Sequence, residues 1–166
     1  MRLVFLFITG LLFSCQSRIQ PLDEKKHLQP EFWRSFSDSK GCDTLSLYAW
    51  NASGTVGLEV TALNIPTSAS EEFLLEVAKR DVVILVETGA NIPKNFCVNE
   101  IQQIPVAYVY EGVSGAVRMS IRFGEDGKPQ KASARLEDVV VVEPKTQKQI
   151  TIQGLNLGML DLWPRR

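Results

Sequence analysis

The sequence is poor in the side chains on which most catalytic and metal sites depend. Its 166 residues include one histidine and three cysteines. The histidine, His27, lies in a polar stretch that offers no fixed partner for acid–base catalysis. No Gly-x-Ser-x-Gly elbow, glycine-rich phosphate loop or His-Glu-x-x-His pattern occurs. The sequence therefore predicts no catalytic residue, no metal site and no cofactor.

The chain also has no excess of positive charge and only one long apolar run. Its 18 Lys and Arg residues balance 19 Asp and Glu residues, for a net charge of −1. Nucleic-acid binding domains carry a basic patch or stripe, so nucleic acid is not an expected partner. The apolar run is at the N-terminus and is shorter than the roughly 20 residues that a membrane-spanning helix needs.

This N-terminal run has the layout of a secretory signal peptide. Arg2 is followed by mostly apolar residues from Leu3 to Phe13. The run ends in Leu12-Phe13-Ser14-Cys15, which resembles the lipobox of bacterial lipoproteins. The resemblance implies diacylglycerol on the Cys15 thiol, cleavage after Ser14 and acylation of the new amino terminus. The alternative is an ordinary signal peptide in which Cys15 is incidental.

The residues after Cys15 predict the location of the protein. In the lipoproteins that this segment resembles, an aspartate after the modified cysteine favours retention at the inner membrane, whereas here Gln16 and Ser17 follow. The resemblance therefore implies the outer membrane of the cell envelope, with the lipid as the membrane attachment. The predicted divisions of the chain are a signal peptide at 1–14, a lipidated N-terminus and flexible tether at 15–31, and a folded domain at 32–166.

The two remaining cysteines predict a disulfide. In an exported protein an even pair, Cys42 and Cys97, favours a bridge. The chain-entropy model gives about 4 kcal/mol for closing a loop of this length, about 55 residues. Two free or metal-bound thiols are the alternative, but two cysteines with one distant histidine make a poor metal site.

Most of the domain shows the alternation of apolar and polar residues that is typical of half-buried strands. Short alternating runs are separated by turn sequences at intervals of about 8 to 12 residues. The expected fold is all-β, an antiparallel β-sandwich of the Ig-like or a related type. Expected turns are Asn51–Gly54, Glu125–Lys128 and Pro144–Gln147.

The segment 68–79 is the one place where a short helix competes with a strand. Ser68 and Glu71 have the spacing of a capping box. Phe73, Leu75 and Val77 alternate as in a strand. The strand is preferred because the neighbouring segments are all predicted strands.

The C-terminal half of the chain resembles exported bacterial β-domain proteins of uncharacterised function. The resemblance rests on Asn95-Phe96-Cys97-Val98-Asn99 and on an ending near Trp163-Pro164. This chain departs from the pattern by continuing to Arg165-Arg166. The resemblance implies export and a β-domain and carries no activity.

Two functions compete at this point. The first is a lipid-anchored binding or structural module that contacts an envelope protein or a glycan. Its candidate contact surface is two aromatic pairs, each on one strand face, although such pairs also serve as cross-strand packing. The pairs are Tyr48 with Trp50, and Tyr108 with Tyr110.

The second function is a small hydrolase that uses two carboxylates and acts on an envelope or extracellular substrate. Such an enzyme needs none of the missing motifs. It requires two carboxylates about 5 to 9.5 Å apart in one cleft. The candidates are Glu87, Glu100, Glu111 and Asp138.

Overall fold

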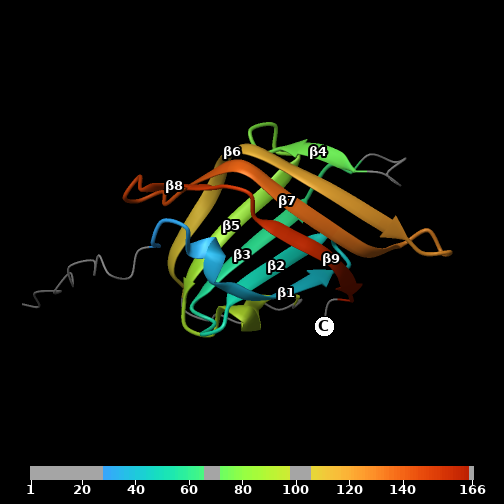
Figure 1. The fold of residues 1–166 in the computed structure, drawn as a ribbon, viewed down its shortest axis with the longest axis horizontal. Coiled ribbons are helices and arrows are strands. Elements are labelled where there is room, and N and C mark those ends of the chain that lie inside the picture. The colour runs from blue at the N-terminus through green and yellow to red at the C-terminus, as the bar shows by residue number, and fades with distance from the viewer. Residues whose placement is uncertain (1–27, 66–71, 98–105, 165–166) are drawn as a thin grey trace, which may run out of the picture.

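A computed structural model describes residues 28–65, 72–97 and 106–164 of the chain. The described residues form nine strands and two single-turn 3₁₀ helices (Figure 1). The predicted all-β class is confirmed. In chain order the elements are η2 (Phe32–Ser35), β1 (Phe36–Cys42), β2 (Ser46–Asn51), β3 (Val56–Ala62), β4 (Phe73–Glu76), β5 (Val82–Gly89), η3 (Ile92–Asn95), β6 (Val106–Phe123), β7 (Pro129–Val142), β8 (Gln149–Ile152) and β9 (Asn156–Trp163).

The sheet closes into a barrel, so the predicted β-sandwich is wrong. Seven strands form the ring, in the order β6, β5, β3, β2, β1, β9, β7, and β7 pairs again with β6. Strand β4 lies beside the second half of β6, and β8 lies beside the second half of β7. Closure leaves no open edge around the ring, which is one way in which antiparallel proteins avoid unpaired strands.

The prediction of a sandwich fails because of the length and the pairing of β6. The sequence pattern suggests two strands, at 105–110 and 117–123, whereas the structure has one strand of 18 residues. The first part of β6 pairs with β5, the later part pairs with β4, and its other edge pairs with β7. A single strand that pairs with β5 in its first part and with β7 in its later part joins what would otherwise be two separate layers.

Bulges allow β6 to bend around the barrel. The register of β6 against β7 shifts between Gly112 and Ser114 and again between Ser114 and Ala116. Gly115 has a φ of 101°, and a Cβ there would lie 2.6 Å from the carbonyl oxygen of Asp138. Only glycine fits this position, and the bulge increases the local bend of the strand.

The barrel closes at a short seam between the two ends of the domain. Strands β1 and β9 run parallel and share two register pairs, Gly41 with Leu162 and Cys42 with Trp163. The other strand pairs of the described chain are antiparallel. The seam therefore depends on much less hydrogen bonding than the rest of the ring.

The alternation predicted from the sequence fills the barrel with apolar side chains. In β5, every second residue from Val82 onward is buried. In the ambiguous segment, residues 73–76 form strand β4, and Leu75 and Val77 are 3% and 5% exposed. The preference for a strand is confirmed for residues 73–76, whereas residues 68–71 lie outside the described part of the chain.

The three predicted turns are confirmed. Gly54 and Gly127 have φ values of 63° and 74°, which suit glycine, and each amide closes its turn on the carbonyl three residues earlier. At the third turn, the Gln147 amide donates to the Glu143 carbonyl. Each of these turns is specified by residues adjacent in the sequence, so a local pattern suffices to predict it.

The membrane-related predictions concern residues that the structure does not describe. Cys15, His27 and residues 16–27 of the predicted tether fall in this group. Among the residues that are described, no helix has the length and apolar character to cross a membrane.

Candidate functional site

One end of the barrel holds a cavity of about 810 Å³. This end lies at the left in Figure 1, where β3 and β6 begin and β5 ends. Residues 28–35 form one wall, and the ends of these three strands form the other. We call this space the mouth cavity. Its volume lies within the range of about 300–1,000 Å³ that is usual for small-molecule sites.

The walls of the mouth cavity are mainly apolar. Leu28, Pro30 and Phe32 line it from the N-terminal segment, and Val56 and Val106 line it from the barrel. Among the described lining residues, Glu31 is the one charged side chain. Its carboxylate lies 3.1 Å from the Arg34 guanidinium in an exposed ion pair. Within the described lining, the cavity therefore offers mainly apolar contact and no Lys or Arg side chain.

Thr88 is the lining residue that comes from the inward face of β5. Alternation along β5 makes Ile84 and Val86 inward-facing, and Thr88 is the next position in this inward series. The residue is 5% exposed, and its Oγ1 has no hydrogen-bond partner among the described residues. A buried hydroxyl without a partner costs about 1–3 kcal/mol. Thr88 is not among the candidates predicted from the sequence, although the alternation along β5 already indicates that it is inward-facing.

The N-terminal segment is held at the mouth by buried contacts. Leu28 is 2% exposed, and its amide donates to the Tyr110 hydroxyl at 3.3 Å. The Lys148 ammonium donates to the Leu28 carbonyl at 3.2 Å. Burial raises the pKa of Tyr110, an effect that the bond from Leu28 partly offsets. The end of the predicted tether is thus packed into the barrel and forms a wall of the cavity.

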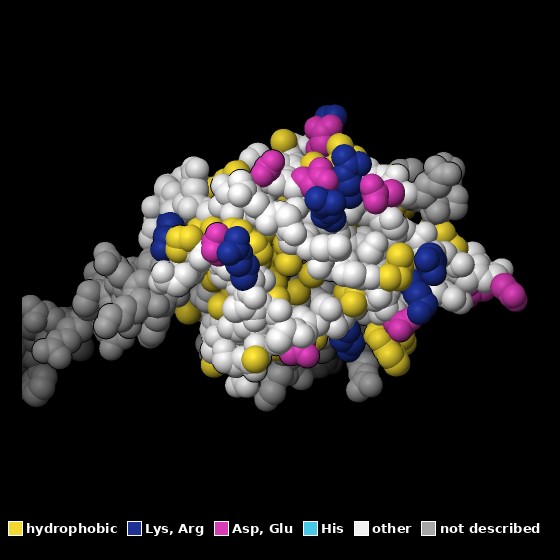
Figure 2. Space-filling view, in the orientation of Figure 1, with side chains coloured by type: hydrophobic (Ala, Val, Ile, Leu, Met, Phe, Trp, Pro, Cys, Tyr) yellow, Lys and Arg dark blue, Asp and Glu magenta, His cyan; other side chains and the backbone are white. Residues whose placement is uncertain are grey.

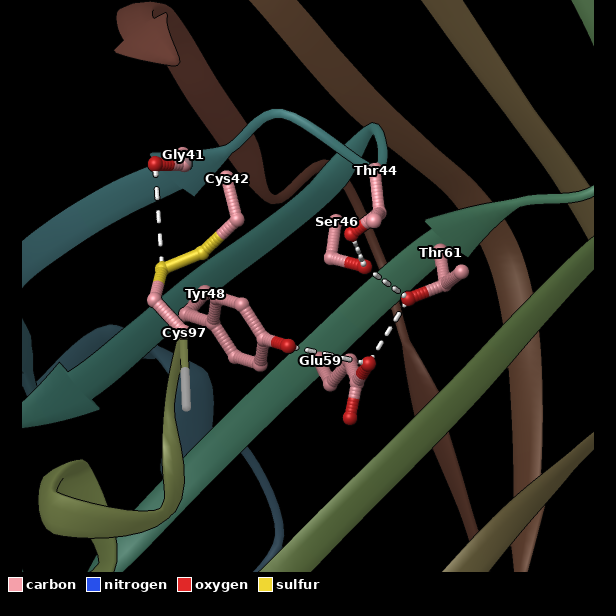
Figure 3. The surroundings of a disulfide bond; sticks show 8 residues. All are labelled: Gly41, Cys42, Thr44, Ser46, Tyr48, Glu59, Thr61 and Cys97. Carbon is pink, nitrogen blue, oxygen red and sulfur yellow. Dashed lines mark hydrogen bonds between the residues drawn. A yellow bond between two sulfur atoms is a disulfide. The ribbon is translucent and has the colours of Figure 1, made fainter. Parts of the chain in front are cut away.

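The disulfide fixes a second layer on the outside of the barrel. Cys42 and Cys97 are bonded, with their Cα atoms 5.8 Å apart, so the predicted bridge is confirmed (Figure 3). The bridge holds the segment after η3 against the outer face of β1 and β2. Phe96 from this segment stacks on Tyr48 with ring centroids 4.3 Å apart and contacts Trp50 at 5.8 Å.

A glycine makes room for this outer layer. A Cβ on Gly57 would lie 2.6 Å from both Ile92 and Phe96. Any larger residue at this position would therefore displace the segment that the disulfide holds.

Next to the disulfide, a chain of polar side chains crosses β2 and β3 (Figure 3). The Thr61 hydroxyl lies 2.7 Å from that of Ser46 and donates to the Glu59 carboxylate at 2.7 Å. Tyr48 donates to the same carboxylate oxygen at 3.2 Å, and Thr44 lies 3.2 Å from Ser46. Every hydroxyl in this chain has a partner, which makes it a cross-strand packing feature.

The aromatic pairs proposed as a contact surface are largely covered. Tyr48 is 4% exposed and lies under Phe96 with half-buried Trp50. Tyr110 is fully buried in the barrel, and Tyr108 packs against the same core. These placements favour the packing alternative, with Trp50 and Tyr108 remaining partly exposed.

The candidate carboxylates do not meet in the mouth cavity. Glu87 and Glu111 lie on the outer side of β5 and β6, since the alternate positions point inward. Asp138 is exposed at the bulge opposite Gly115. Glu100 lies outside the described residues.

The surface of the domain gives no sign of a strongly charged patch on the visible face. Lys and Arg side chains are interspersed with Asp and Glu in Figure 2. The described part of the chain also holds no group of three or more His, Cys, Asp and Glu side chains that could hold a metal ion. The mouth cavity is therefore the best-formed candidate site.

Comparisons with protein-family models, with curated proteins and with solved structures find no match to this chain. The mouth cavity is therefore the main feature of the described residues from which a function can be inferred.

Proposed function

We propose that this protein is a lipid-anchored protein of the bacterial cell envelope, attached to the outer membrane, and that it acts as a non-catalytic binding module. Its ligand is a small, mainly apolar molecule that occupies the mouth cavity. The observation that carries this proposal is the cavity of about 810 Å³ with mainly apolar walls.

The composition of the cavity supports binding over catalysis. Small-molecule sites are mostly apolar and contain a few polar groups that fix orientation. The mouth cavity has this composition, whereas a carboxylate hydrolase would need two acids in one cleft. Neither Glu87 nor Glu111 nor Asp138 is among its described lining residues. The mouth cavity therefore does not support the hydrolase alternative, although Glu87 and Glu111 are diagonal neighbours on the outer face of β5 and β6.

The position of the N-terminal segment connects the cavity with the proposed anchor. Cys15 precedes Leu28 by 13 residues. An extended chain of that length spans at most about 45 Å. A lipid on Cys15 would therefore keep the mouth cavity within reach of a membrane, which is a natural source of apolar ligands.

Binding is tested with N-phenyl-1-naphthylamine, an uncharged fluorescent probe. The full chain carrying Cys15→Ala is used, because it has no acyl groups of its own that compete for the cavity. We expect saturable fluorescence enhancement that is lost in Val56→Phe and in Val106→Phe, since each adds a ring to the cavity wall. Saturable binding that both variants leave unchanged, or no binding to the parent chain, would refute the proposal.

Lipidation of Cys15 is tested separately by detergent phase partitioning of the native chain and of Cys15→Ala. We expect the native chain in the detergent phase and the variant in the aqueous phase. A native chain that partitions into the aqueous phase, as the variant does, would refute lipidation.

A further inference from the structure

We infer that the protein has a second binding site, a small polar pocket beside β8, and that its ligand is a neutral saccharide. The pocket has a volume of about 330 Å³. Residues of the N-terminal segment between 30 and 34 form one side of it, and residues between 149 and 153 form the other. Both sides lie at the left in Figure 1, where η2 and β8 are labelled or seen. We call this space the edge pocket. It shares Pro30 and Glu31 with the mouth cavity but does not depend on the ligand of that cavity.

The edge pocket lies along one edge of β8. Successive residues of a strand point to opposite faces, so a space that touches Gln149, Ile150 and Thr151 lies beside the strand and not over one of its faces. The other edge of β8 pairs with β7, and no further strand of the described chain pairs with β8. The backbone N–H and C=O groups along an open edge are hydrogen-bonding groups that a ligand can use.

Trp33 supplies the apolar part of the site. Its ring packs against the core and meets the ring of buried Phe32 edge-on, with the centroids 5.4 Å apart and the planes at 87°. These contacts hold the indole in place, and the half-buried side chain lines the pocket. A pyranose has a face of C–H bonds that packs on an aromatic ring, while its hydroxyls point outward from the rim.

The remaining side chains supply neutral partners for such hydroxyls. Gln149, Thr151 and Gln153 are exposed and line the pocket. A glutamine amide offers two N–H donors and an acceptor oxygen, and a threonine hydroxyl both donates and accepts. A sugar hydroxyl also donates and accepts, so it can pair with each of these groups.

The two charges that line the edge pocket compensate each other. The Arg34 guanidinium lies 3.1 Å from the Glu31 carboxylate, and both side chains are exposed. A phosphate or carboxylate ligand would have to compete with Glu31 for this guanidinium. A neutral ligand leaves the ion pair intact, which favours an uncharged sugar over an anion.

The size of the pocket favours a sugar over a peptide strand. An open edge also suits strand addition, in which main-chain hydrogen bonds run along several residues. Here the N-terminal segment forms the facing wall, and the volume of about 330 Å³ is at the lower end of the range for small-molecule sites. A sugar ring suits this space, whereas an extended peptide needs a longer open edge.

The experiment titrates the isotope-labelled Cys15→Ala chain with maltotriose and with chitotriose, and NMR follows the indole N–H signals. The chain has three tryptophans, and Trp33→Phe identifies the signal of Trp33. We expect at least one of the two sugars to shift this signal saturably, with a Kd of about 1 mM, as suits a ligand that contacts the protein through one ring. The signal of Trp163, an exposed residue on β9, should not move.

Two glutamine variants test the site without disturbing the fold. In Gln149→Ala we expect the Kd to rise about three- to tenfold, the size of one hydrogen bond. Gln130→Ala is the matched control, because it makes the same change at an exposed glutamine near the start of β7 and should leave the Kd unchanged.

The inference is overturned if neither sugar shifts the Trp33 signal, if the shift occurs at another tryptophan instead, or if Gln149→Ala binds as well as Gln130→Ala. A Thr-Val-Thr-Val peptide with blocked ends is titrated in the same way. A shift of the Trp33 signal by this peptide and by neither sugar would make the edge pocket a strand-addition site. A sugar that displaces N-phenyl-1-naphthylamine would bind in the mouth cavity, which would also overturn the inference. Absence of sugar binding leaves the proposed function standing, because that function is tested with the probe.

Discussion

Replacing Thr88 with valine should stabilise the protein, whereas the same change at Thr61 should destabilise it. Both residues are in the barrel wall, Thr61 on β3 and Thr88 on β5, and valine has nearly the shape and the strand preference of threonine. The two substitutions therefore differ mainly in what the lost hydroxyl was bonded to.

The magnitudes follow from the hydrogen bonds. Thr88 Oγ1 is buried without a partner among the described residues, so its removal should raise the free energy of unfolding by about 1 kcal/mol, at the lower end of the cost of an unsatisfied group. Thr61 Oγ1 is bonded to both Ser46 and Glu59 at 2.7 Å, so its removal should lower the free energy of unfolding by about 1 kcal/mol. Ser46 and Glu59 each keep another partner, which limits the loss.

The assay is thermal and urea unfolding of both variants at pH 7, after extraction of apolar molecules from the protein. For a chain of this size, 1 kcal/mol corresponds to about 2–4 °C in Tm, so the two variants should differ by about 4–8 °C. If Thr88→Val lost as much stability as Thr61→Val, the hydroxyl of Thr88 would have a protein partner. The assignment of this hydroxyl as unsatisfied would then be refuted.

Three further predictions concern the rest of the barrel. Hydrogen bonds from Thr146 lower the pKa of Glu143, so Glu143→Gln should destabilise the protein at pH 7. Because the folded pKa is the lower one, the difference should shrink as the pH falls below about 4, and unfolding at a series of pH values checks this. Reduction of the Cys42–Cys97 bridge should lower the free energy of unfolding by about 2–4 kcal/mol in urea titrations, and an unchanged midpoint would contradict that expectation. Gly115→Ala should cost more than about 1 kcal/mol, because its φ is positive and a Cβ there would contact the opposite backbone; a neutral effect would show that the bulge can move.

The sequence predicts those parts of this fold that depend on neighbouring residues. Alternation identifies the strands, and glycine with asparagine or aspartate marks the turns, because both are properties of a few adjacent positions. The disulfide is also predictable, since the predicted export and lipidation of Cys15 leave one pair of cysteines.

Closure of the barrel depends on pairings that no local pattern encodes. The pattern gives each strand a buried face but not a partner, and both a sandwich and a barrel satisfy it. What decides is that β6 continues through its bulges and that β1 meets β9, whose paired residues Gly41 and Leu162 are at opposite ends of the domain. Sandwich and barrel therefore share a sequence signature.

The candidate site is only partly predictable from the sequence for a similar reason. Alternation places the aromatic pair on β2 on one face, but its cover, Phe96, comes from a distant segment. The mouth cavity is formed by chain ends that meet only in the folded barrel. Thr88 can be assigned to the inside from its strand, whereas the absence of a partner among the described residues requires the three-dimensional structure.

The short seam between β1 and β9 has a consequence for the order of folding. The ring cannot close until the last strand of the chain reaches the first, and contacts between such distant residues form slowly. The disulfide loop contains β2, β3 and β5, which pair with one another without β6, so this part of the wall can form before β6, β7 and β9 are in place. We expect the amides of β9 that face β1 to be the first in the barrel wall to exchange hydrogen for deuterium and the last to become protected during refolding. Slow exchange at β9 equal to that of β3 would contradict this order.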